Sequence, residues 1–434
     1  MHAPWNECRR KRVSLVNLRL ILTKLPDFHI HTLPNGIRVL HKQVPHTKIA
    51  HCGFMMDIGS RDELPHELGL AHFWEHMAFK GTQKRKSFHI LNRLESVGGE
   101  LNAYTTKEKI SFYASVLENH FEKAFDLLTD ITFNSTFPTK EIEKERGVIL
   151  EEMAMYLDTP EDAIIDEFDE VVFQNHPLGN NILGTRESVS SFTRENFQAF
   201  IQRNLSTDKL VFCSVSNWPM ERVVKLAEKY LSHIPAQIQT RERLPFAGYE
   251  AKNIVVEKAI QQAHCVIGCP AYPLSDPRRL PFFMLVNILG GPGMNSRLNL
   301  AVREKHGLVY TIDANYATYI DTGLFGIYFG TEKKQLKRTT GLVMKELQRL
   351  REKPMGSLQL HTAKEQLMGQ LAMAEESNMG FMMMMGKSIL DLGQIESLNE
   401  IFDQIRKVEA KDLVEIANET LREDNLSFLQ YVPS

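Results

Sequence analysis

A short sequence occurs twice in this chain, and the segments after it come in the same order both times. Ala-His-Cys stands at 50–52 and again at 263–265, each time inside a strand-like run that ends in a polar turn. Both runs precede a helical stretch, a Gly-Gly pair at 98–99 or 290–291, and two strand-like segments. Because three-residue repeats are common by chance, the shared order of elements is the stronger argument. It predicts a duplicated α+β domain.

The length of the chain and one polar segment set the predicted domain limits. With 434 residues and 43% hydrophobic content, the chain exceeds one ordinary domain. We predict an N-terminal extension at 1–27 and two homologous domains at 28–235 and 236–434, joined within the polar stretch 233–248. The predicted fold class is α+β, with each domain a mainly antiparallel sheet packed against helices.

Composition excludes several classes of partner. The 51 basic and 54 acidic residues are well mixed, so no basic surface for nucleic acid is expected. No apolar run approaches the roughly 20 residues that span a bilayer, so we expect no membrane span. The five cysteines Cys8, Cys52, Cys213, Cys265 and Cys269 form no CxxC pair. An odd count of this kind is typical of reduced thiols that pack in a core.

The N-terminal segment has two interpretations. Arg-Arg-Lys-Arg at 9–12 precedes a basic amphipathic run, but polar residues interrupt this run and no small-residue cleavage site follows. A secretory signal is therefore not expected. The segment is either a simple extension of a cytoplasmic protein or an organelle presequence, in which case the compartment is the mitochondrial matrix.

The stretch HFWEH at 72–76 places polar side chains in an apolar helix. At 3.6 residues per turn, His72 and His76 lie about 40° apart, and Glu75 lies about 60° to the other side of His72. Two imidazoles and a carboxylate in a core are costly without strong partners. The apolar residues predicted around them are Leu68, Leu70, Phe73, Trp74, Met77 and Phe79.

A divalent metal ion is one such partner. Histidines at i and i+4 can both reach one Zn²⁺ at about 2.0–2.1 Å, and the stretch fits the inverted zinc motif His-x-x-Glu-His. The glutamate, Glu75, would then serve as a base toward water. The alternative is a helix whose histidines simply form hydrogen bonds with backbone or water.

A third ligand is expected from the helical stretch 140–157. When Glu145 is set to zero, Glu152 falls at about −20° on the same stripe. Acids inside an apolar stripe need a cation or a histidine N–H as partner. We assign Glu152 to the metal and Glu145 to a hydrogen bond with a ligand histidine, although helical phase leaves these two roles interchangeable. The other stripe members are Ile142, Val148, Ile149 and Tyr156, whereas Glu143, Lys144 and Glu151 point elsewhere.

Further motifs follow HFWEH in order: MAFKGT, GGELNAYT, ERGVILEEM, HPLGNNILG and REKHGLVYT. Over about residues 28 to 430 the chain resembles the insulinase/pitrilysin superfamily of zinc peptidases, the inverzincins. The resemblance is greatest to the short branch that includes bacterial processing-type peptidases and the β subunit of mitochondrial processing peptidase. It implies one Zn²⁺ per chain, held by His72, His76 and a glutamate 76 or 77 positions later, which is Glu152. It also implies that Glu75 is the general base and that Glu145 supports a ligand.

The resemblance also implies substrate contacts. Asn102 and Ala103 would hold an extended peptide at a strand edge, which offers main-chain hydrogen bonds to any sequence; the alternative for Asn102 is a buried cross-strand asparagine. Arg303 and Tyr310 would meet the substrate at the zinc. From the residues alone, they could equally be an exposed helix-end cation and a half-buried aromatic.

The second half lacks the metal motif, since PFFMLVNIL occupies the corresponding place at 281–289. The resemblance implies that this half is non-catalytic and that four domains close the peptidase chamber. We therefore expect a homodimer in which Arg303 and Tyr310 reach the partner's site. The alternatives are a structural or assembly subunit without activity, or an active subunit that needs a different partner chain.

Two glycine- and methionine-rich segments remain. GGPGMN at 290–295 suits a hinge, a substrate-facing loop or an ordinary turn. NMGFMMMMG at 378–386 is expected to be helical core, with a promiscuous apolar surface as the alternative.

Overall fold

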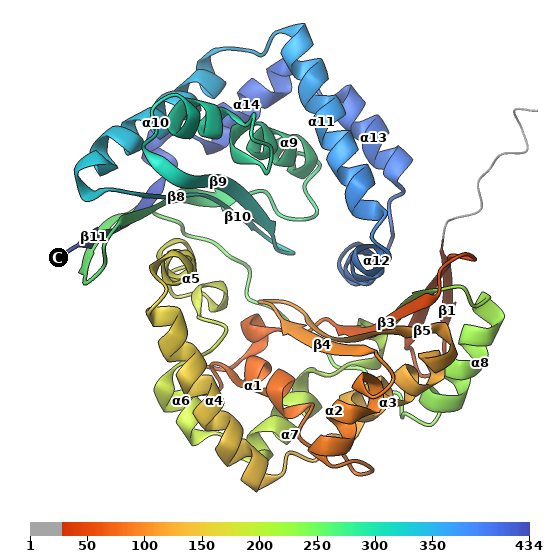
Figure 1. The fold of residues 1–434 in the computed structure, drawn as a ribbon. Coiled ribbons are helices and arrows are strands. Elements are labelled where there is room, and N and C mark those ends of the chain that lie inside the picture. Colours follow the sequence, from red (N-terminus) through yellow and green to blue (C-terminus); the bar gives the residue numbers. More distant parts are fainter. Residues whose placement is uncertain (1–27) are drawn as a thin grey trace, which may run out of the picture.

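The computed structural model describes residues 28–434, which form two halves with one β-sheet each (Figure 1). The predicted extension at 1–27, including Cys8, lies outside the described residues. The strands of the first half are β1 (His29–Thr32), β2 (Arg38–Gln43), β3 (Ile49–Met56), β4 (Glu100–Thr105), β5 (Ile110–Leu117) and β6 (Leu210–Ser216). Those of the second half are β7 (Asn253–Lys258), β8 (Ala263–Ala271), β9 (Val309–Thr318), β10 (Gly323–Thr331) and β11 (Ser427–Pro433).

The two sheets share a plan of five strands, and the first sheet has β1 as an additional edge strand. The first has the strand order β1-β2-β6-β3-β5-β4 and the second has the order β7-β11-β8-β10-β9. Neighbouring strands are antiparallel except for one parallel pair in each sheet, β2 with β6 and β7 with β11. The prediction of mainly antiparallel sheets in an α+β fold is confirmed, and the sheets are mixed.

The helices also repeat in order. The first half contains α1 (Leu70–Met77), α2 (Ser87–Glu95), α3 (Phe121–Phe133), α4 (Thr139–Leu157), α5 (Pro160–Val172), α6 (Arg186–Ser191), α7 (Arg194–Asn204) and α8 (Met220–Leu231). The second contains α9 (Arg279–Gly290), a π-helical segment (Asn299–Glu304), α10 (Leu336–Glu352), α11 (Ser357–Glu375), α12 (Asn378–Leu392), α13 (Leu398–Lys407) and α14 (Ala410–Thr420). Each half contains a hairpin followed by three helices. In the first half these are β4-β5-α3-α4-α5, and in the second they are β9-β10-α10-α11-α12. By this order, α12 is the counterpart of α5.

These two corresponding helices are exchanged between the halves. Helix α5 packs on β8 and β11 of the second sheet, and α12 packs on β3 and β6 of the first (Figure 1). Met382 and Met385 of α12 are buried together with Leu40, Met55 and Val211 of the first sheet. The methionine-rich run is therefore helical core, as predicted, but it covers the sheet of the other half.

Truncation of Met385 is expected to destabilise the protein. Met385→Ala removes a side chain with no exposed area, and a buried Met→Ala change of this kind costs about 2–5 kcal/mol of unfolding free energy. Met373→Ala is the matched control, because Met373 is 70% exposed and its loss is expected to change stability by less than about 0.5 kcal/mol. Urea unfolding measures both; equal effects would contradict the packing of α12 between the halves.

The remaining predictions concern the linker and the thiols. Residues 235–252 contain no helix or strand, within the region where the joint is predicted, and the domain limits themselves stay a prediction.

Four cysteines, Cys52, Cys213, Cys265 and Cys269, are buried free thiols. None of the described helices has both the length and the apolar composition that a bilayer crossing requires. The segment 290–295 starts at the last residue of α9 and continues as a bend and a turn, and its role stays a prediction.

Candidate metal centre

The start of α1 is fixed by a carboxylate and a glycine. The backbone N–H groups of Gly69 and Ala71 donate to Glu63 at 2.9 and 2.7 Å, which satisfies amides at the helix start that lack a helical acceptor. Gly69 has φ +92°, and a Cβ there would lie 2.4 Å from the carbonyl oxygen of Leu183. Only glycine allows this approach. The segment HPLGNNILG, which contains Leu183, therefore packs against the start of α1.

The apolar side chains of α1 set its rotation. Phe73, Trp74 and Met77 have no exposed area, and the Trp74 ring meets Phe112 and Phe200 edge to face at 6.0 and 6.3 Å. With these side chains held in the core, the polar ones are directed to the opposite side. The helix begins at Leu70, after the left-handed Gly69, and ends at Met77, so Leu68 and Phe79 flank it.

The polar side of α1 meets α4 at three predicted ligands. One ligand atom from each of His72, His76 and Glu152 lies within 4.8 Å of the others. Glu152 Oε2 is 3.8 Å from His72 Nε2 and 3.5 Å from His76 Nε2. Ligands of a tetrahedral zinc ion at about 2.0–2.1 Å stand about 3.4 Å apart, and both separations from Glu152 are close to this value.

Glu145 holds the other nitrogen of one histidine. His76 Nδ1 lies 3.2 Å from Glu145 Oε2, and a proton on Nδ1 leaves the lone pair of Nε2 directed toward Glu152. Lys80 Nζ pairs with Glu145 Oε1 at 2.6 Å. Burial alone raises the pKa of Glu145, but the hydrogen bonds from His76 and Lys80 outweigh it and lower the pKa. Sequence reasoning missed Lys80. Its position four residues after His76 could have indicated that it lies near the same partner, Glu145.

The environments of His72 and Glu75 differ in a way that suits a ligand and a base. Burial, with a smaller effect of neighbouring His76, lowers the pKa of His72 to about 3, so its imidazole is neutral at pH 7. Burial also raises the pKa of the half-buried Glu75, and Glu152 adds to the rise. A carboxylate whose pKa moves toward neutrality is a better proton acceptor near pH 7.

One residue of the predicted stripe on α4 is wrongly placed. Val148 is 49% exposed, whereas Ile142, Ile149 and Glu145 are buried. Ile142 and Val148 stand at opposite edges of the predicted stripe, about 60° to either side of Glu145, and only the Ile142 edge is covered. Val148 lies at the edge of the stripe and stays in solvent.

The predicted peptide-binding residues lie on an edge strand. Strand β4 is the last in its sheet and contacts α1, so the edge runs beside the metal ligands. Asn102 is exposed opposite Tyr113 of β5, and Ala103 packs against the core. The alternative of a buried cross-strand asparagine is wrong.

Arg303 and Tyr310 lie together in the second half. The Arg303 guanidinium is 5.9 Å from the centre of the Tyr310 ring, and Tyr310 is 85% exposed. The alternative of a half-buried aromatic is therefore wrong. No hydrogen bond or ion pair within residues 28–434 joins either side chain to His72, His76 or Glu152.

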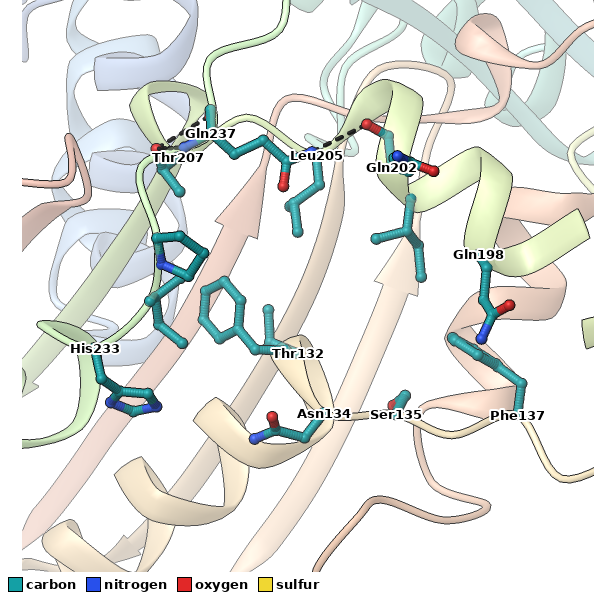
Figure 2. Close-up of a pocket in the computed structure, with 14 residues that line it drawn as sticks. Thr132, Asn134, Ser135, Phe137, Gln198, Gln202, Leu205, Thr207, His233 and Gln237 are labelled. Atoms are coloured by element: carbon teal, nitrogen blue, oxygen red, sulfur yellow. Dashed lines mark hydrogen bonds between the residues drawn. The ribbon is translucent and has the colours of Figure 1, made fainter. Parts of the chain in front are cut away.

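A pocket of about 460 Å³ lies elsewhere in the first half (Figure 2). Its lining comes from the end of α3, from α7 and from the start of the linker, and it includes none of the predicted site residues. His233 is its one titratable lining residue, and we assign it no role. Gln198, Gln202 and Gln237 are also among the residues that line it.

Comparisons with known proteins identify the family. Residues 38–186 match the insulinase family, peptidase family M16, and residues 191–367 match the peptidase M16 inactive domain. An uncharacterized zinc protease of Bacillus subtilis is 32% identical, over 91% of this chain and 96% of that protein. One of Rickettsia felis is 35% identical, over 90% and 94%. The β subunit of the mitochondrial processing peptidase of Saccharomyces cerevisiae is 29% identical, over 95% and 92%.

Solved structures share the fold. A peptidase M16 inactive domain from Pseudomonas fluorescens superposes with a TM-score of 0.87 at 18% identity, over 94% of this chain and 98% of that one. A protease from Helicobacter pylori gives a TM-score of 0.86 at 19% identity, over 94% and 100%. The chain belongs to peptidase family M16, the insulinase family, and its relatives from Bacillus subtilis and Rickettsia felis are named zinc proteases.

Proposed function

We propose that this protein is a zinc-dependent endopeptidase with the inverted motif His-x-x-Glu-His, and that it cleaves extended peptides or unfolded segments. The observation that supports this most is the approach of His72, His76 and Glu152 to within 4.8 Å of one another from two separate helices. Two imidazoles and a carboxylate with one open position are the ligand set of a catalytic zinc site. One zinc ion per chain is expected.

The residues around the ion have distinct roles. When bound, zinc would supply a Lewis acid for water and for the scissile carbonyl. Glu75 takes a proton from the attacking water and gives it to the leaving amine, a role that suits its raised pKa. Glu145 fixes the ring of His76 through Nδ1.

The substrate is proposed to pair with β4. Asn102 and Ala103 offer an exposed edge beside α1, and main-chain pairing there accepts many sequences but requires an extended chain. Folded proteins are then poor substrates. Arg303 and Tyr310 are proposed to stabilise the developing oxyanion from the partner chain of a homodimer, because both are accessible and neither contacts the ligands of its own chain.

Loss of the Glu145 carboxylate is expected to weaken zinc binding. Glu145→Gln replaces the carboxylate that orients His76 with a neutral amide, which is a weaker acceptor, and such changes around a metal ligand cost about 10–100-fold in metal affinity. Competition with a chromophoric chelator measures the affinity. Glu143→Gln is the matched control on the exposed side of α4 and should leave it unchanged. Equal affinities for both variants and the unchanged protein would contradict the role of Glu145.

Peptide digestion tests the proposed function as a whole. The full chain is incubated with a peptide mixture, and mass spectrometry maps the cut sites with and without a chelator. We expect internal cuts that the chelator stops and added zinc restores. Cleavage that continues in the chelator, with no zinc in the protein, would rule out a zinc endopeptidase.

Two alternatives give different results. An assembly subunit without activity would contain no zinc, whereas the proposed enzyme contains about one ion per chain. An active subunit that needs another chain would contain zinc but cleave only after its partner is added, and sedimentation would show whether the chain alone forms the homodimer.

The proposed location is the cytoplasm. Uncharacterized zinc proteases of bacteria are among the relatives, and they do not favour the mitochondrial matrix. Residues 9–12, on which that alternative rested, lie outside the described part of the chain.

A further inference from the structure

The turn between β4 and β5 contains three consecutive charged residues, and all three are buried. Lys107 and Glu108 are each 7% exposed and Lys109 is 4% exposed. Turns usually lie in solvent, and lysine and glutamate are almost never buried without a partner. Removing their charges from water costs free energy that only close partners offset. These side chains therefore hold the turn against other parts of the molecule.

The two lysines reach different helices. Lys107 Nζ pairs with Asp169 of α5 at 3.0 Å. Lys109 Nζ pairs with Asp57 at 3.0 Å and with Asp391, near the end of α12, at 2.5 Å. Because α12 belongs to the second half, Lys109 joins the edge hairpin of the first sheet to the other half of the chain.

Glu108 forms a second connection through Arg61. Arg61 Nη1 lies 2.7 Å from Glu108, and the guanidinium makes two parallel bonds to Asp321 at 2.6 and 2.8 Å. Asp321 lies in the turn between β9 and β10, the counterpart of the β4–β5 turn. The Arg61 side chain is only 1% exposed, so this paired geometry is strong and specific. The corresponding turns of the two halves thus meet at one arginine.

The backbone of the turn is held as well. The N–H of Arg61 donates to the carbonyl of Lys107 at 2.8 Å. Arg243 of the linker donates to the carbonyl of Glu108 at 3.2 Å and pairs with Asp62 at 2.9 Å. Both the main chain and the side chains at this end of β4 are therefore fixed.

We infer that Lys107, Glu108 and Lys109 are positioning residues for the peptide, through which Asp321 and Asp391 of the second half hold β4 beside α1. This inference rests on the proposed pairing of substrate with β4. Main-chain pairing binds an extended peptide only while the strand edge is held in place, so a displaced β4 would bind the peptide less tightly. The second half would then contribute to substrate binding within its own chain without contacting the peptide.

The double variant Asp321→Asn/Asp391→Asn tests this in the full chain. Arg61 keeps Glu108 and Lys109 keeps Asp57, so neither cation loses its last partner. For a peptide long enough to pair along all of β4, we expect KM to rise about tenfold, within the usual range of coupling between sites. The kcat and the zinc content should stay unchanged, because the ligands and Glu75 are not touched.

Two further variants separate positioning from general damage. Asp321→Glu keeps a carboxylate for Arg61 and should keep the original KM. Asp403→Asn changes an exposed aspartate of α13 and should have no effect. An unchanged KM in the double variant would overturn the inference, and so would a joint fall in kcat and zinc content, which would indicate a merely structural role. Absence of cleavage by the unchanged protein would instead refute the proposed function.

Discussion

Glu75→Gln is expected to abolish peptide cleavage while the protein keeps its zinc. Glutamine is close to glutamate in size but cannot accept the proton of the attacking water, and loss of a positioned base costs about 10²–10⁴-fold in rate. Since Glu75 also returns that proton to the leaving amine in our proposal, we expect a loss at the upper end of this range. The measurement is turnover of a fluorogenic peptide together with metal analysis.

The control for this variant is Glu95→Gln at the exposed end of α2, which should retain full turnover. Retained turnover in Glu75→Gln would rule out this residue as the base. Loss of zinc together with activity would show that Glu75 acts on the metal site, and the assignment of the base would then fail as well.

Glu152→Gln is expected to remove both the metal and the activity. The change takes the one negatively charged donor from the cluster, and a neutral amide is a poor zinc ligand. We expect less than about a tenth of the original zinc after dialysis, and a rate loss of roughly 10³-fold or more because zinc activates both water and carbonyl.

The neighbouring Glu151 provides a matched control on the same helix. Glu151 is exposed, and Glu151→Gln should keep about one zinc per chain and full activity. If the two variants bound equal amounts of zinc, the third ligand would have to be sought elsewhere. Zinc added in excess should restore part of the activity of Glu152→Gln only if His72 and His76 still hold the ion.

Helical periodicity was sufficient to select the acids of α4 from the sequence. A carboxylate at the phase of Ile142 and Ile149 must face the same neighbour as they do, and Glu145 and Glu152 indeed lie on the side of α1. Phase does not say which nitrogen of His76 each acid approaches, because that depends on the separation and rotation of two helices. In the structure, Glu145 lies at Nδ1 and Glu152 at Nε2.

The exchange of α5 and α12 between the halves could not be read from the sequence. An apolar stripe indicates that a helix is covered, but it does not identify the sheet that covers it. Met385 has the pattern of a core residue, and nothing in its neighbours distinguishes its own sheet from the other one. Hydrophobic composition predicts that a helix is buried, whereas the sheet against which it packs depends on the path of the whole chain.

The buried charges of the β4–β5 turn were also beyond sequence analysis. Lys107 and Glu108 have the composition of an ordinary solvated turn. Arg61 and its partner Asp321 are 260 residues apart in sequence, so no local pattern links them. The duplication predicted the two hairpins, but not that their turns would meet.

The most direct test of the metal centre is an anomalous diffraction measurement at the zinc absorption edge on crystals of the full chain. Our account predicts one peak per chain, about 2.0–2.2 Å from His72 Nε2, His76 Nε2 and a carboxylate oxygen of Glu152. A well-ordered site without a peak, or a zinc peak on other side chains while Glu152 points away from the imidazoles, would contradict it.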